Sequence, residues 1–460
     1  MLAKNQTVRL EVEDLNNLGF GVGHVDGQTV FVSGAVDGDL VDARIIRTER
    51  NYAVARTERI VTASAYRRPS PCAAAGCGGC AYLAVSGAHE ADLKVARVRA
   101  AFRKAGLPDV PVLPLGGTGE RFGYRNKAQY PVAADGKGGL RIGFFAPKSH
   151  RVVEAAECPL QAAVFAPILR TVRRLAETYG ILPYREEDHT GLLRHIYLRT
   201  NRAQDDVSLV FVLCGRTLPH EEDLVRELRA AHPEIGGILI NVNTADTNVV
   251  LGKEYRLLWG KPYMTDTLAG VSLRIAPAAF YQVNHDAAEL LYARAADLAA
   301  LCGTETVLDL YCGVGSIGLS MAHRAREVIG VEIEPEAVRC AQENAARSGI
   351  GNARFYCGDA GDAEDLFRRA EEERGAPLLP DVVILDPPRK GCDERLLSAL
   401  ARRAPARIVY ISCHPETLAR DAARLIALGY APGPVAPFDL FPCTGHVECV
   451  TAFARTTDLP

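Results

Sequence analysis

Short apolar runs and longer amphipathic stretches alternate along the C-terminal part of the chain, from Leu273 onward. Short apolar, β-branched runs are typical of buried strands, and apolar residues at helical spacing are typical of the helices that cover them. The pattern predicts strands over 306–310, 327–331, 381–385 and 407–411, and helices over 316–325 and 335–348. Strands that alternate with helices in this way predict a doubly wound parallel sheet and an α/β fold class.

The first 62 residues have a different pattern, in which short β segments follow one another closely. Residues 8–13 alternate apolar and polar positions, residues 19–23 are interrupted by glycines, and Asp26-Gly27 is a hairpin signal. Several short strands in so few residues predict a small closed β-barrel. Arginines in its last two strands favour either RNA binding or an ordinary solvated face, because acidic residues lie among them.

The residues between these two patterns mix short strands and helices around a group of cysteines. The helical pattern over 84–104 is expected to pack on the last domain. We therefore predict a barrel over 1–62, a central α+β domain over 63–270 and a third domain over 271–460.

The composition narrows the class of protein. Of the 460 residues, 48% are hydrophobic and 24% are charged, which is ordinary for a globular protein with several domains. No apolar run approaches the ~18 residues that a membrane span requires, and residues 1–7 lack the apolar core of a signal peptide. We expect a cytoplasmic monomer that does not bind membranes. The net charge of −3 argues against indiscriminate nucleic-acid binding but leaves room for a local basic groove.

A glycine-rich loop follows the strand over 306–310. Gly313, Gly315 and Gly318 allow a tight turn and the close approach of a ligand, and Glu332 follows Gly313 by 19 residues at the end of the next strand. By that spacing alone, NAD and S-adenosylmethionine compete as the cofactor. Asp309 makes the loop Asp-x-x-x-Gly-x-Gly, which resembles the loop of class I methyltransferases and favours S-adenosylmethionine.

Cys413 follows an apolar run and precedes a proline turn, so it is expected at the carboxyl end of a strand, where open α/β sheets bind ligands. A buried core cysteine is the commoner role of this residue type. Beside a methyl donor, a thiolate can add to carbon 6 of a pyrimidine and make carbon 5 nucleophilic. A general base must then remove the carbon 5 proton. Glu448 is the candidate, with a solvent-facing strand residue as the alternative, and we interpret His446 as structural.

Four segments resemble those of the RNA uracil-5-methyltransferase family: 280–284, 386–391, 412–421 and 441–450. The first 62 residues resemble a TRAM domain, an OB-like RNA-binding barrel, through Gly19-Phe20-Gly21-Val22 and Val36-Asp37-Gly38-Asp39. The resemblance implies that Cys413 is the nucleophile and Glu448 the base. It also implies a set of cofactor contacts, namely Gln282, Tyr311, Ser316, Glu332, Asp359 and Asp386.

The barrel and the cysteines together resemble the ribosomal-RNA branch of the family, which implies a uridine in 23S ribosomal RNA as the target. Transfer RNA is the alternative target, and a non-catalytic RNA-binding assembly factor is a more distant alternative function. We expect an unstacked loop uridine, because a stacked base cannot present carbon 6 to a thiol. A basic strip is expected to hold the RNA, with five candidates: Arg121, Arg125, Lys127, Arg194 and Arg199.

Cys72, Cys77 and Cys80 lie within nine residues, and Cys158 is a fourth, remote thiol. Four thiols can hold either zinc or an iron–sulfur cluster. Zinc sites more often show paired short knuckles, so three close thiols and one remote thiol favour iron–sulfur. The spacing alone is typical of a plant-type two-iron centre, whereas the family resemblance implies a [4Fe–4S] cluster.

Overall fold

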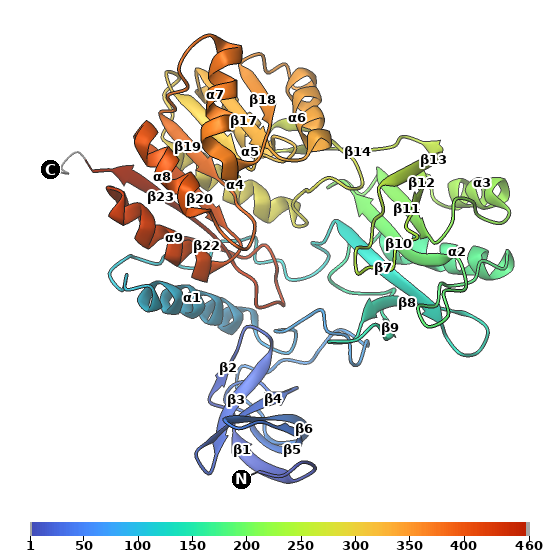
Figure 1. The fold of residues 1–460 in the computed structure, drawn as a ribbon. Helices are drawn as coiled ribbons and strands as arrows, with labels where there is room; N and C mark the ends of the chain where they lie inside the picture. The colour runs from blue at the N-terminus through green and yellow to red at the C-terminus, as the bar shows by residue number, and fades with distance from the viewer. Residues whose placement is uncertain (1, 457–460) are drawn as a thin grey trace.

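The computed structural model describes residues 2–456. The chain forms three β-sheet structures (Figure 1): a small N-terminal barrel, a central sheet and a larger C-terminal sheet flanked by helices. No helix among residues 2–456 is long and apolar enough to cross a bilayer.

The N-terminal barrel is one six-stranded sheet with the order β1-β5-β6-β4-β3-β2. Alternate residues of its strands face a common core that includes Val30, Val32 and Val41. Asp26 and Gly27 both have positive φ in the β3–β4 turn, as a two-residue hairpin requires. The strands are β1 (Thr7–Glu11), β2 (Asp14–Leu15), β3 (Phe20–Val25), β4 (Gln28–Ser33), β5 (Leu40–Thr48) and β6 (Tyr52–Thr62).

The central sheet has seven strands in the order β13-β12-β11-β10-β7-β8-β9. Helices α2 (Phe165–Thr178) and α3 (Glu221–Ala231) cover one of its faces and share its main core. Its strands are β7 (Lys127–Ala134), β8 (Leu140–Phe145), β9 (Val152–Glu154), β10 (Leu193–Thr200), β11 (Val207–Leu213), β12 (Ile235–Val242) and β13 (Glu254–Gly260). A hairpin of β14 (Met264–Leu268) and β15 (Val271–Ile275) leads to the C-terminal sheet.

The C-terminal sheet confirms the predicted doubly wound fold. Its order is β18-β17-β16-β19-β20-β23-β21, and its first five strands are parallel. Val307 faces one hydrophobic core and Leu308 the other, so β16 is buried on both faces. The strands are β16 (Thr306–Leu310), β17 (Glu327–Glu332), β18 (Ala353–Cys357), β19 (Val382–Leu385), β20 (Arg407–Ser412), β21 (Tyr430–Pro432), β22 (Ala436–Phe438) and β23 (Glu448–Arg455).

Helices lie on both faces of this sheet (Figure 1). The helix expected over 316–325 is α5 followed by the 3-10 turn η1 (Ala322–Arg324). The helices are α4 (His285–Ala299), α5 (Ser316–Met321), α6 (Pro335–Arg347), α7 (Ala363–Arg374), α8 (Glu394–Arg403) and α9 (Pro415–Ala427), with a second 3-10 turn, η2 (Ala360–Asp362).

Helix α1 (Gly87–Lys104) precedes the central sheet in sequence but packs against α9 of the C-terminal sheet. Val98 and Phe102 belong to the same hydrophobic core as Leu418 and Leu425. The helix begins after Ser86, whose hydroxyl accepts a hydrogen bond from the His89 backbone N–H. An early segment of the chain thus completes one face of the C-terminal sheet.

Candidate active site

A cavity of about 750 Å³ lies at the carboxyl ends of the parallel strands. The strand order reverses between β16 and β19, and α/β sheets bind ligands at such a switch point. Seven of the eight residues predicted for catalysis or cofactor binding line this cavity, namely Gln282, Tyr311, Glu332, Asp359, Asp386, Cys413 and Glu448.

The glycine loop after β16 is held by two carboxylates. Asp309 is fully buried, and its Oδ2 accepts a hydrogen bond from the Gly318 N–H at 2.9 Å. A Cβ at Gly318 would lie 2.7 Å from that oxygen, so only glycine fits there. Glu332 accepts the Gly313 N–H at 3.0 Å and the Glu334 N–H at 3.0 Å. The loop is therefore fixed before any ligand arrives, and Glu332 is held at the cavity wall.

Ser316 is the predicted residue that does not line the cavity. It is buried at the first turn of α5, and its hydroxyl lies 3.0 Å from the Tyr292 hydroxyl. Asp359 does line the cavity, and its Oδ1 accepts the Gly361 N–H at 2.8 Å.

Cys413 and Glu448 are brought together by strand pairing. Strand β23 runs antiparallel to β20 with Ser412 opposite Cys449, so the next pair along this register is Cys413 and Glu448. Cys413 is half-buried, whereas the Glu448 side chain is only 5% exposed. The thiol and the carboxyl thus lie at adjacent strand ends in one cavity.

The charges in this cavity favour a positively charged ligand. Burial raises the pKa of Glu448 to about 8 and that of Asp386 to about 7. Burial, together with Glu448 and Asp386, raises the pKa of the Cys413 thiol to about 11, whereas the Arg389 guanidinium and a backbone hydrogen bond act in the opposite direction. A bound cation would lower all three pKa values because it stabilises the charged forms.

The sequence did not predict how the segment carrying Gln282 is held. On the central sheet, the Tyr197 hydroxyl donates to the Pro277 carbonyl at 2.9 Å, and the Asn126 amide donates to the Gln282 carbonyl at 2.8 Å. Phe280, in the same segment, is 66% exposed and lines the cavity. These contacts join residues far apart in sequence, so no local pattern signals them.

The four predicted cluster cysteines line a second cavity, of about 450 Å³. Burial raises the pKa of Cys80 to about 12, and Cys158 raises it further as a like charge. Arg125 and Lys127 line the same cavity. Within the part of the chain that the structure describes, no group of three or more His, Cys, Asp or Glu side chains is arranged to hold a metal ion.

The structure contradicts two of the five residues of the predicted basic strip. Arg199 is fully buried and Arg194 is 7% exposed, so neither can reach an RNA phosphate. Their guanidinium groups donate to backbone carbonyls of the irregular segments at 243–245 and 276–279, which need donors where they cross the sheet. Arg121 pairs with the buried Glu90.

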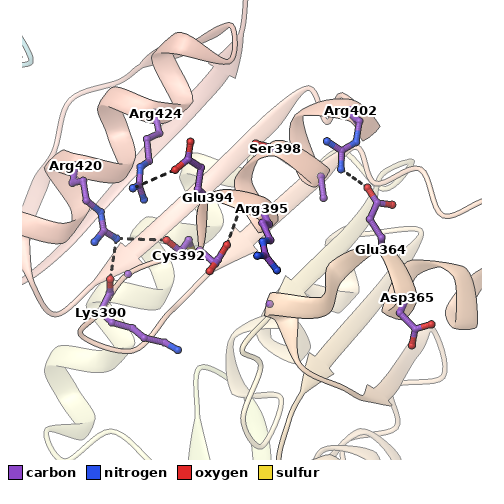
Figure 2. A pocket seen from close by; sticks show the side chains of 14 residues that line it. Glu364, Asp365, Lys390, Cys392, Glu394, Arg395, Ser398, Arg402, Arg420 and Arg424 are labelled. Atoms are coloured by element: carbon purple, nitrogen blue, oxygen red, sulfur yellow. Dashed lines mark hydrogen bonds and ion pairs between the residues drawn. The ribbon is translucent and has the colours of Figure 1, made fainter.

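A groove of about 1070 Å³ adjoins the active-site cavity and shares Gly361, Lys390, Asp393 and Arg395 with it. Figure 2 shows that its charges are interleaved rather than uniformly basic. Arg402 pairs with Glu364 and Arg424 with Glu394. Because these cations are paired with carboxylates, the groove does not offer the uniformly basic RNA-binding surface that the sequence predicted.

Comparisons with known proteins agree with this architecture. A family model described as tRNA (Uracil-5-)-methyltransferase matches residues 242–456, and a TRAM domain model matches residues 3–57. The chain is 38% identical to an uncharacterized RNA methyltransferase of Halalkalibacterium halodurans, over 97% of this chain and 96% of that protein. It is also 38% identical to an uncharacterized RNA methyltransferase of Listeria monocytogenes, over 98% of each chain.

Among solved structures, the tRNA (uracil-54, C5)-methyltransferase of Pyrococcus abyssi, in complex with S-adenosyl-L-homocysteine, matches with a TM-score of 0.78. The identity is 26%, and the match covers 97% of this chain and 99% of that chain.

The raised pKa of Glu448 predicts how stability depends on pH. The neutral, buried carboxyl stabilises the fold fully below its ordinary pKa of 4.5, and this contribution is lost as the pH rises through about 8. Glu448→Gln removes the titration, so its stability relative to wild type should increase by about 1 kcal/mol per pH unit between about pH 5 and 8. Denaturant unfolding across this pH range measures the difference. Glu187→Gln, at an exposed carboxylate, is the control, and a pH-independent difference for Glu448→Gln would contradict the prediction.

Proposed function

The chain belongs to the RNA uracil-5-methyltransferase family, and from that premise we propose that it methylates carbon 5 of one uridine in 23S ribosomal RNA by covalent thiol catalysis. The observation that carries the mechanism is the placement of Cys413 and Glu448 at paired strand ends, in the cavity formed beside the glycine loop. The family uses S-adenosylmethionine, which when bound supplies an electrophilic methyl group on a positively charged sulfonium.

Several residues that line the cavity are candidates for holding the cofactor. Glu332 ends β17, where a carboxylate accepts both ribose hydroxyls. Gln282, Tyr311, Asp359 and Asp386 line the rest of the proposed cofactor site. The positive charge of a bound cofactor would lower the raised pKa of Asp386. Ser316 is left out of the proposed contacts because its hydroxyl bonds to Tyr292 inside the fold.

Cys413 acts first in the proposed reaction. Its thiolate adds to carbon 6 of the uracil, and carbon 5 becomes nucleophilic and takes the methyl group. The raised pKa of the free thiol, about 11, means that few thiolates exist before the substrates bind. Arg389 lowers the pKa of Cys413 and is the proposed activating cation.

Glu448 acts second. It removes the proton from carbon 5, the carbon 5–carbon 6 double bond re-forms, and the Cys413 thiolate leaves. A base with a pKa near the working pH transfers protons efficiently, and the pKa of about 8 for Glu448 meets that condition. His446 is a poor competitor for this role because burial and the nearby Arg389 lower its pKa to about 4.

Two substitutions separate these two steps. Cys413→Ala should abolish transfer of labelled methyl groups to RNA that lacks 5-methyluridine, with cofactor affinity nearly unchanged, because the thiol acts on the base. Glu448→Gln should accumulate a protein–RNA adduct that survives SDS, because the thiolate cannot be expelled after methyl transfer.

Cys302→Ala, at an exposed cysteine, is the matched control and should turn over normally. Normal turnover of Glu448→Gln without an adduct would reject Glu448 as the base. A wild-type protein that binds RNA but transfers no label would instead be a non-catalytic RNA-binding factor.

The cysteine cavity supports a [4Fe–4S] cluster as a second cofactor. The four thiols line one cavity. Four cysteine thiolates are the usual ligand set of such a cluster. Arg125 and Lys127 would offset the negative charge of four thiolates. The proposed role is structural, because methyl transfer moves no net electrons.

Protein purified without oxygen should therefore be brown, with a broad visible absorbance and about four irons per chain. Cys80→Ser should lose most of the iron, whereas Cys302→Ser should keep it. Colourless wild-type protein with stoichiometric zinc would refute the cluster.

The proposed target is an unstacked loop uridine, because flipping a stacked base costs a few kcal/mol. The N-terminal TRAM domain is the proposed RNA-binding module. Transfer RNA is the second candidate target, since the Pyrococcus abyssi tRNA (uracil-54, C5)-methyltransferase shares the architecture over nearly the whole chain.

Deletion of the gene, followed by mass-spectrometric mapping of 5-methyluridine in both RNA classes, tests the target. We expect one 5-methyluridine to disappear from 23S ribosomal RNA and to return with the wild-type gene but not with Cys413→Ala. Loss from transfer RNA alone would overturn the ribosomal target and leave the chemistry intact.

A further inference from the structure

The loop that leads into Glu448 is anchored by a buried group of charges that the proposed mechanism does not use. This loop, residues 439–447, joins β22 to β23, and Phe438 pairs with Glu448 at its base. We call the two strands and the loop the catalytic hairpin. Helix α1 lies beside it and contributes Glu90 and Lys94, one helical turn apart.

Lys94 Nζ donates to three acceptors. It lies 2.7 Å from Glu90 Oε1, 2.7 Å from Asp439 Oδ1 and 3.2 Å from the Phe441 carbonyl oxygen. All three ammonium donors are therefore used, and the last two acceptors belong to the catalytic hairpin.

Both carboxylate oxygens of Glu90 also accept hydrogen bonds. Its Oε1 also accepts the backbone N–H of Cys443 at 2.8 Å, and its Oε2 accepts Arg121 at 2.7 Å. We call Glu90, Lys94, Arg121 and Asp439 the ion clamp. It holds two cations and two anions, and both Glu90 and Lys94 are 1% exposed. Removing one member of such a buried group leaves the charge of its partner uncompensated, so the four side chains stabilise one another in this arrangement.

The hairpin loop depends on these outside contacts. Its polar contacts at 441–445 run largely to other segments: the Tyr82 N–H donates to the Cys443 carbonyl at 2.9 Å, and the Tyr124 hydroxyl donates to the Pro442 carbonyl at 3.0 Å. Arg97, on α1, donates to the Gly445 carbonyl at 2.7 Å. A Cβ at Gly445 would lie 2.0 Å from the Asn17 carbonyl oxygen of the barrel, so the barrel also touches the loop.

We propose that the ion clamp positions the catalytic hairpin so that Glu448 can take the carbon 5 proton. This inference rests on the proposed function. In the step that depends on the clamp, Glu448 gains the proton, the electron pair of the C–H bond forms the carbon 5–carbon 6 double bond, and the carbon 6–sulfur bond breaks to release the Cys413 thiolate. Thiol addition and methyl transfer depend on it less, because Cys413 follows β20 and Asp386 follows β19, and these two strands pair with each other outside the hairpin.

The proposal is tested by removing the clamp's central cation. Full-length Lys94→Met is mixed with labelled S-adenosylmethionine and substrate RNA, and both the first-turnover methyl transfer and the SDS-stable adduct are measured per folded molecule. We expect methyl transfer close to wild type, and an adduct fraction that rises several-fold because release is slow. Lys261→Met is the matched control: Lys261 Nζ also lies 2.7 Å from a carboxylate, that of Asp206, but in the central part of the chain.

Asp439→Asn is the second variant if Lys94→Met does not fold, since it removes one charge and keeps an acceptor for the Phe441 N–H. Loss of methyl transfer and adduct together, in proportion to lost folded protein, would overturn the proposal and make the clamp merely structural. An adduct increase as large for Lys261→Met would overturn it as well. Wild-type protein that forms no 5-methyluridine would signal failure of the proposed function instead, so the two failures are distinguishable.

Discussion

The antiparallel ladder between β20 and β23 is the contact on which the active site depends. Backbone hydrogen bonds between the two strands fix the register that sets Ser412 opposite Cys449, and a shift by one residue would turn Glu448 to the other face of the sheet. The parallel strands β16, β17 and β19 contribute the ligand loops, but only this pair joins the thiol to the carboxyl. Both strands are buried, so the register is supported by two hydrophobic cores.

Buried carboxyls in the active-site cavity favour a positively charged ligand. Asp309, Asp386 and Glu448 all have pKa values raised by burial, and Arg389 is the cation that opposes the shift at Glu448. In the proposed reaction, a sulfonium in this site would favour ionised carboxyls, and the loss of its charge on methyl transfer would raise the pKa of Glu448, the proposed base. The charge of the cofactor would thereby control the strength of the base.

Much of the C-terminal fold could be predicted because its signals are local. The strand predicted over 306–310 is β16 to the residue, and the strands predicted over 327–331 and 407–411 differ by one residue at one end. Cys413, Glu448 and the glycine loop with Glu332 followed from motifs near strand ends, whereas other cavity residues, Gln282 among them, came from the family resemblance. What failed depends on packing between distant segments: Arg194 and Arg199 resemble surface cations in sequence but are covered by irregular segments.

The position of α1 has a consequence for the order in which the parts of the chain can fold. Arg97 on α1 bonds Glu416 across 319 residues of sequence, and Lys94 bonds Asp439 across 345. Because this helix is synthesised long before α9 and the hairpin, its apolar face can form these contacts only after the C-terminal residues have been made. Residues 271–460 made alone would lack the helix that covers Leu418 and Leu425, so the methyltransferase sheet is not an excisable module. The domains therefore cannot finish folding in the order in which they follow one another along the chain.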